Sequence, residues 1–235
     1  MSNPLASLLN ICHGFAQSRL PQACLLCGAR VAGQLLCAPC AADLPRLPDD
    51  RCPQCALPSP GGAVCGACLK HPPAFDRTVA VHAYGFPLDA LVRHCKYAGA
   101  LDLTDWFAAS LAEALAAQPR VDLILPMPLH EARLAERGFN QAVEIARRLA
   151  PRLGIPWSPQ GCRRIRDTPP QAGLDLKARR RNLRDAFRCD LDLTGKHVAV
   201  LDDVMTSGAS LDELAKTIRA AGAASVTAWV VARTL

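Results

Sequence analysis

Apolar residues follow two different periods along the C-terminal part of the chain. Strand-like apolar runs cover residues 78–86, 121–125, 197–201 and 225–232. Helical spacing covers residues 88–97, 103–117, 141–153 and 211–221. Short strands that alternate with helices predict an α/β fold with a parallel sheet. Ligands of such sheets bind at the carboxyl ends of the strands, so the loops that follow the strands are the first candidates for a site.

The N-terminal part of the chain has a different composition. Residues 20–72 are rich in Cys, Pro and Gly and poor in large apolar side chains, and Lys70–Ala74 ends this segment. We expect a helical segment over 1–19, a small module over 20–72 and the α/β domain over 75–235. A chain of 235 residues, half of them apolar and 20% charged, has room for both folded parts.

The sequence lacks the marks of secretion and of a membrane span. Met1–Gln17 has no basic start, and Asn10, Cys12 and His13 interrupt its apolar run. No apolar run approaches the roughly 18 residues of a transmembrane helix. We therefore expect a protein that is not membrane-inserted and that works in the cytoplasm, where thiols stay reduced.

Four C-x-x-C knuckles occupy the small module. Their cysteines are Cys24, Cys27, Cys37, Cys40, Cys52, Cys55, Cys65 and Cys68. The second four repeat the spacing of the first at an offset of 28 residues. Four thiolates per half suit tetrahedral Zn²⁺, and a segment with so little apolar area needs a metal to fold. We expect two structural zinc sites with sequential ligand sets. A cross-braced zinc pairing, disulfides, an iron–sulfur cluster or a redox C-x-x-C would use the same residues.

The remaining cysteines are Cys12, Cys95, Cys162 and Cys189. They lie far apart in the sequence. We expect them to be small buried residues rather than a site.

The most informative segment follows the strand at 197–201. Two carboxylates, Asp202 and Asp203, come at the end of this strand, and a loop of small residues then leads into a helix. The loop consists of Thr206, Ser207, Gly208, Ala209 and Ser210. Free N–H groups at a helix start and nearby hydroxyls bind phosphate, and a glycine permits close approach. Carboxylates suit vicinal hydroxyls or Mg²⁺. The pattern therefore predicts a ribose 5-phosphate site; an ordinary strand–turn–helix junction with an acidic turn is the alternative.

A second loop with positive charge leaves the strand at 121–125. Arg133 and Arg137 precede a helix for which Asn140 is the expected N-cap. Two arginines at the rim of the same sheet can bind an anion. The alternative is a basic helix start in solvent.

The run from Val198 to Ser210 resembles the phosphoribosyl pyrophosphate (PRPP) signature of type I phosphoribosyltransferases. Ser207 and Ser210 replace threonines of that signature and keep its hydroxyls. The resemblance implies that Asp202 and Asp203 are the catalytic pair that contacts the ribose of Mg²⁺-bound PRPP, and that residues 206–210 hold the 5-phosphate. The position of Arg133 and Arg137 resembles the pyrophosphate loop of glutamine-type PRPP amidotransferases, which implies diphosphate binding.

Residues 163–188 carry the net charge of the chain. They hold nine basic and three acidic residues, an excess equal to the overall net charge of +6. Such a segment can cover a bound polyanion or lie along a nucleic-acid backbone. The candidates for this cover or DNA contact are Gln171, Arg179, Arg180, Arg181 and Asn182. A solvated basic helix around Leu176–Phe187 is the alternative.

Several motifs together resemble the ComF/GntX family. They are RGFNQA at 137–142, T-x-x-Q at 168–171, R-x-x-N-L-x-x-A-F at 179–187, DDVMTSGAS at 202–210 and the four cysteine knuckles. The resemblance implies a type I phosphoribosyltransferase-like parallel sheet with a small added N-terminal zinc-binding module, in which four cysteines hold each zinc. It also implies a link to natural transformation or to the use of extracellular DNA, without an established reaction.

Two functional hypotheses follow. The first is a phosphoribosyltransferase-like protein that binds PRPP or a nucleotide, with an unidentified acceptor if it turns over. The second is a non-catalytic adaptor that binds single-stranded DNA through its basic segment. Its zinc module would dock a DNA-uptake partner such as a helicase or a channel protein.

Overall fold

The computed structural model describes residues 21–167 and 182–235 of the 235-residue chain. It divides into two compact units, Met1–Leu44 and Pro45–Leu235. The described part of the smaller unit contains a two-stranded antiparallel sheet, β1 (Pro21–Ala23) with β2 (Arg30–Ala32), followed by the short helix α2 (Ala38–Ala42). The larger unit begins with the second pair of knuckles, where a 3₁₀ turn (Pro60–Gly62) and α3 (Gly66–Lys70) are the regular elements.

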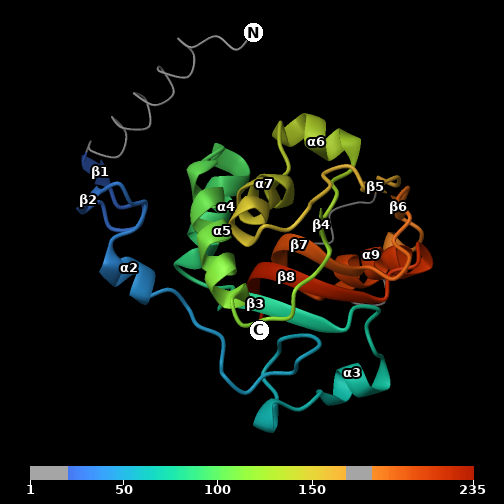
Figure 1. The fold of residues 1–235 in the computed structure, drawn as a ribbon. Coiled ribbons are helices and arrows are strands. Elements are labelled where there is room, and N and C mark those ends of the chain that lie inside the picture. The colour runs from blue at the N-terminus through green and yellow to red at the C-terminus, as the bar shows by residue number, and fades with distance from the viewer. Residues whose placement is uncertain (1–20, 168–181) are drawn as a thin grey trace. The chain divides into compact units, whose positions relative to one another are not determined.

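A four-stranded parallel sheet forms the centre of the larger unit (Figure 1). Its strand order is β3 (Arg77–Ala83), β8 (Ser225–Arg233), β7 (His197–Met205) and β4 (Leu123–Pro126). The strands β7 and β8 are buried on both faces over most of their length, as expected for a parallel sheet covered on both sides. The predicted α/β class, a parallel sheet with a small N-terminal cysteine-rich module, is confirmed.

Helices connect these strands in the larger unit. In Figure 1, α4 (Leu88–Ala98), α5 (Asp102–Leu115) and α7 (Gln141–Leu153) group together, and α9 (Ala209–Ala220) lies apart from them against β7 and β8. The predicted helix at 141–153 has the expected bounds, and Asn140 caps it by accepting a hydrogen bond from the Ala142 N–H at 3.0 Å.

The structure departs from the sequence-based expectation in three segments. The strand β7 continues to Met205, because β8 pairs with it as far as the Met205–Arg233 position. The arginine-bearing loop contains a helix, α6 (Glu131–Arg137), which ends at Gly138 with φ +76°. Within the basic segment, β5 (Cys162–Arg164) and β6 (Phe187–Cys189) form an antiparallel ribbon.

None of the helices within residues 21–167 and 182–235 is long and apolar enough to cross a bilayer.

Candidate functional site

The eight knuckle cysteines form two clusters of four. One cluster joins Cys24, Cys27, Cys37 and Cys40; the other joins Cys52, Cys55, Cys65 and Cys68. Within each cluster the sulfur atoms all lie within 4.8 Å of one another. The ligand sets are therefore sequential, as predicted, and not cross-braced. Each cluster has one sulfur pair, Cys27–Cys37 or Cys55–Cys65, at 3.7 Å. Tetrahedral zinc with bonds of about 2.3 Å needs a sulfur spacing of about 3.8 Å, so both clusters fit zinc.

The two clusters repeat the same backbone geometry. The Cys37 N–H lies 3.4 Å from the Cys24 sulfur, and the Cys65 N–H lies 3.4 Å from the Cys52 sulfur. Amides of Cys37 and Cys27 lower the pKa of Cys24 to about 6. Burial raises the pKa of Cys52, but amides of Cys55 and Cys65 outweigh burial and lower it to about 7. Thiolates are the metal-binding form of cysteine, so Cys24 and Cys52 are prepared for a cation. The neighbouring thiols raise the pKa of Cys40, and burial raises the pKa of Cys68.

The second cluster is joined to the phosphate-type loop by Arg233 of β8. This side chain is only 3% exposed. Its Nε donates to the Cys55 carbonyl at 2.7 Å, and its Nη1 donates to the carbonyls of Met205 and Thr206. Thr78 joins the same knuckle segment to strand β3, because its N–H donates to the Pro53 carbonyl at 3.0 Å. A cavity of about 610 Å³ lies between this cluster and the loop. Hydrogen bonds of Arg233 therefore link the loop to the second knuckle pair.

The loop at 206–210 has the geometry of an anion site. Gly208 adopts φ +77° immediately before α9, and a β-carbon there would lie 2.6 Å from the Met205 Cε. Residues 202 and 204–211 line a small hollow of about 30 Å³ at the start of the helix. The Ser207 hydroxyl lies 3.4 Å from the Ala209 N–H, within the same turn. Hydroxyl side chains thus gather where the positive end of α9 favours negative charge.

The two carboxylates beside this loop have different environments. Asp203 is 7% exposed, and its Oδ2 lies 2.8 Å from the Lys96 Nζ. Asp202 accepts a hydrogen bond from the Asp203 N–H at 2.9 Å. Burial, with the adjacent charge of Asp203, raises the pKa of Asp202 to about 7. Burial alone would lower the pKa of Lys96, but the charge of Asp203 raises it. The pair therefore holds one carboxylate in an ion pair with Lys96 and one whose pKa lies near neutrality.

Lys96 connects these carboxylates to a basic cavity. This cavity has a volume of about 960 Å³, and Lys96, Arg133, Arg137 and Tyr97 are among its lining residues. The Arg137 guanidinium lies 5.8 Å from the centre of the Tyr97 ring, which is 73% exposed. Arg164 lies near enough for the charge of Arg133 to lower its pKa, after the larger effect of burial. Both predicted arginines thus share a cavity with a lysine that contacts Asp203.

The structure brings most of the predicted residues to one rim of the sheet. The end of β7 holds Asp202 and Asp203, and residues 206–210 follow it. Lys96, which contacts Asp203, lines the same cavity as Arg133 and Arg137. Of the expected cover or DNA contacts, Gln171, Arg179, Arg180 and Arg181 lie outside the described residues. Asn182 is described and is partly buried.

Sequence reasoning missed Lys96 and Arg233. Lys96 is an ordinary basic residue in the last turn of a helix, and only the fold brings it to Asp203. Arg233 ends an otherwise apolar strand. A charged residue at the end of a buried strand was the available signal for a structural role. A buried arginine needs several hydrogen-bond acceptors, so it marks a place where several segments meet.

Residues 15–69 match the family model of the double zinc ribbon domain. DNA utilization protein YhgH of Salmonella typhi is 36% identical over 225 residues, which cover 92% of this chain and 99% of that protein. Competence protein F of Haemophilus influenzae is 33% identical over 178 residues, 72% of this chain and 78% of that protein. Among solved structures, glutamine PRPP amidotransferase from B. subtilis, complexed with ADP and GMP, superposes with a TM-score of 0.36. It is 18% identical, over 54% of this chain and 25% of that chain.

Proposed function

This chain belongs to the ComF/GntX family of competence and DNA-utilization proteins, and on that premise we propose that it binds Mg²⁺-bound PRPP at the rim of its parallel sheet. Binding takes place in the cytoplasm and serves the use of extracellular DNA. Two structural zinc ions occupy the cysteine clusters.

The observation that carries this proposal is the continuity of three subsites. The hydroxyl loop at 206–210, the carboxylates Asp202 and Asp203, and the arginine-lined cavity follow one another, and Lys96 bridges the last two at 2.8 Å from Asp203. PRPP presents a phosphate, two vicinal hydroxyls and a diphosphate in the same order. An adaptor that bound only DNA would need neither the carboxylates nor the hydroxyl loop.

Each subsite has a chemical task in this proposal. The loop and the start of α9 hold the 5-phosphate. Asp202 and Asp203 accept hydrogen bonds from the ribose hydroxyls and fix the sugar. Arg133 and Arg137 neutralise the negative charge of the diphosphate. Bound Mg²⁺ would add charge neutralisation at the diphosphate, and the carboxylates are the residues that would hold it.

Calorimetric titration with PRPP in the presence of Mg²⁺ tests the proposal. We expect micromolar binding by the wild-type chain. Asp202→Asn combined with Asp203→Asn should weaken it at least tenfold, because the ribose hydroxyls and Mg²⁺ lose both negatively charged partners. Asp89→Asn, in the first turn of α4 and in an ion pair with Arg93, is the matched carboxylate control and should bind normally. Wild-type protein that binds no PRPP would refute the proposal.

The second candidate is single-stranded DNA binding by the basic segment. The exposed side chains of Arg163 and Arg188 share one carboxylate, Asp190, at 2.5 and 2.6 Å, so the ribbon keeps an excess of positive charge. We expect charge reversal at Arg179, Arg180 and Arg181 to weaken binding of an oligo-dT strand in fluorescence anisotropy and to reduce its salt dependence. The same variant should keep its PRPP affinity. If this variant lost affinity for both oligo-dT and PRPP, the two ligands would not bind at separate sites.

A further inference from the structure

Two of the four cysteines outside the knuckles face each other in the ribbon of β5 and β6. Cys162 and Cys189 are direct cross-strand partners in this antiparallel pair. Their separation in the sequence had suggested isolated buried thiols, and the fold corrects that expectation. Neither residue belongs to a metal cluster of the described residues.

Backbone hydrogen bonds define the type of this pair. The Ile165 N–H donates to the Ala186 carbonyl at 2.8 Å, and the Asp190 N–H donates to the Gly161 carbonyl at 3.3 Å. The positions 165–186 and 161–190 are therefore hydrogen-bonded pairs. Along an antiparallel ladder such pairs alternate with non-hydrogen-bonded pairs. The positions 162 and 189 lie one step from the 161–190 pair and form a non-hydrogen-bonded pair.

That pair type suits a disulfide. In non-hydrogen-bonded pairs the Cα atoms lie about 4.5 Å apart and the side chains project to the same face. A disulfide accepts Cα separations of about 4.4–6.8 Å. The two strands can therefore be linked without moving their backbones.

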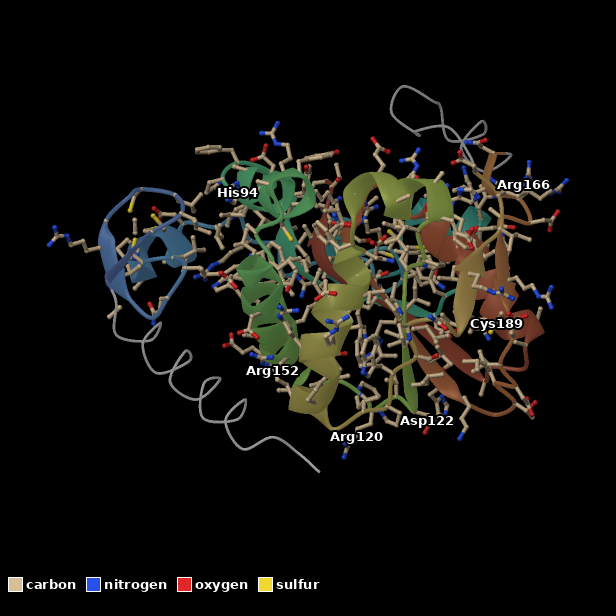
Figure 2. All side chains as sticks on the ribbon, turned by 90° about the horizontal axis from the view of Figure 1, so that it is seen from above. His94, Arg120, Asp122, Arg152, Arg166 and Cys189 are labelled. Carbon is tan, nitrogen blue, oxygen red and sulfur yellow. The ribbon has the colours of Figure 1, made fainter. Side chains whose placement is uncertain are left out.

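The two thiols differ in accessibility. Cys162 is 4% exposed, and burial, followed by the charge and hydrogen bond of Cys189, raises its pKa. Cys189 is partly exposed, with its sulfur 3.9 Å from the Leu191 carbonyl, and Figure 2 shows it on the ribbon near the edge of the view. An oxidant therefore reaches Cys189 first, and Cys162 is placed to resolve the product.

We propose that Cys162 and Cys189 form a reversible disulfide when the protein meets a low-molecular-weight disulfide oxidant. The Cys189 thiolate attacks one sulfur of the oxidant, forms a mixed disulfide and releases one thiolate. The Cys162 thiolate then attacks the Cys189 sulfur and releases the second. Two cysteine thiols lose two protons and two electrons, and the oxidant becomes two thiols. A dithiol reductant reverses both steps, so the pair stays reduced in an unstressed cytosol.

The link would stiffen a ribbon that reaches the candidate site. Arg164 lies on β5 opposite Phe187, one non-hydrogen-bonded pair beyond the cysteines, and its guanidinium is 5.9 Å from the Phe187 ring centre. The charges of Arg133 and Asp202 both act on Arg164. Oxidation therefore fixes the strand that carries a site-facing arginine.

Oxidised glutathione, added to the zinc-loaded full-length chain, is the probe. After alkylation of free thiols, peptide mapping should find Cys162 joined to Cys189, and a dithiol should restore both alkylated peptides. Cys162→Ser should stop at the glutathione adduct on Cys189, whereas Cys95→Ser, which alters another buried cysteine, should still form the link. The oxidised wild type should also melt at a higher temperature than the reduced protein, because the link constrains the unfolded chain.

Two results would overturn the inference. One is wild-type protein in which both cysteines remain alkylated after treatment. The other is a stable glutathione adduct on wild-type Cys189 that Cys162 does not displace. Both results come from the wild-type chain, so they hold even if a variant fails to fold.

Discussion

The Lys96 Nζ lies 2.8 Å from the Asp203 Oδ2, and this contact joins the last turn of α4 to the end of β7. The side chains are 22% and 10% exposed, so water screens the pair weakly. Lys96 also lines the cavity that contains Arg133 and Arg137. One lysine therefore balances the charge of the carboxylate pair and places that pair beside the basic cavity.

Removing this lysine should destabilise the protein. We expect Lys96→Met to lower the free energy of unfolding by about 2–3 kcal/mol, because it leaves a buried carboxylate unpaired. Adding Asp203→Asn should recover most of the loss. Lys216→Met, whose exposed side chain pairs with Asp212 and Glu213, is the control and should cost under about 1 kcal/mol. Urea unfolding of the four proteins measures these values, and equal losses for Lys96→Met and Lys216→Met would contradict the structural role.

The raised pKa of Asp202 should make its effect on stability depend on pH. A carboxyl that titrates near 7 in the folded chain and near 3.9 when unfolded gives stability at low pH that is lost as pH rises through 7. The free energy of unfolding of Asp202→Asn relative to wild type should therefore rise by roughly 2–3 kcal/mol between pH 5 and pH 8. Comparison with wild type at each pH cancels the pH dependence of zinc binding.

Asp192→Asn is a control for which the expected change in the free energy of unfolding has the opposite sign. The Thr194 hydroxyl and amide lower the pKa of Asp192, so its substitution should cost stability above its ordinary pKa. A pH-independent effect of Asp202→Asn would argue against the raised pKa.

Local signals in the sequence predicted much of this architecture. Asn140 before an amphipathic run predicted the start of α7, and the regular knuckle spacing predicted two sequential cysteine clusters. The short helix α6 was not predicted, because its N-cap is His130, an uncommon residue at that position. Gly138 does mark its end. These are short-range features, which depend on neighbouring residues alone.

The contacts that assemble the site were not predictable in this way. Lys96 meets Asp203, and Arg233 meets Cys55, only through tertiary packing. Cys162 faces Cys189 only through strand register. No periodicity in one sequence encodes such pairs, because each partner fits its own element equally well without the other.

The conformation of Gly208 should be essential to the anion loop. We expect Gly208→Ala to destabilise the protein by about 2 kcal/mol, because alanine at φ +77° is strained and its methyl group would meet Met205. It should also weaken binding of ribose 5-phosphate at least tenfold. Gly154→Ala, at φ +63° with open space around it, carries the backbone strain alone. It should cost about 1 kcal/mol and keep normal binding, as measured by urea unfolding and calorimetry. Normal ribose 5-phosphate binding by Gly208→Ala would place the phosphate elsewhere.

The two cysteine clusters should differ in their effect on ligand binding. Cys40 and Cys68 occupy equivalent positions in the repeat, but Cys68 belongs to the larger unit, where Arg233 joins the Cys55 carbonyl to the loop carbonyls. Each Cys→Ala substitution should remove one of two bound zinc ions. Cys68→Ala should also lower the melting temperature of the larger unit and weaken PRPP binding, because the loop loses one of its supports. Cys40→Ala should leave PRPP affinity unchanged. Zinc release, thermal unfolding and calorimetry measure the three effects, and full PRPP affinity in Cys68→Ala would show that the loop holds its shape without the second cluster.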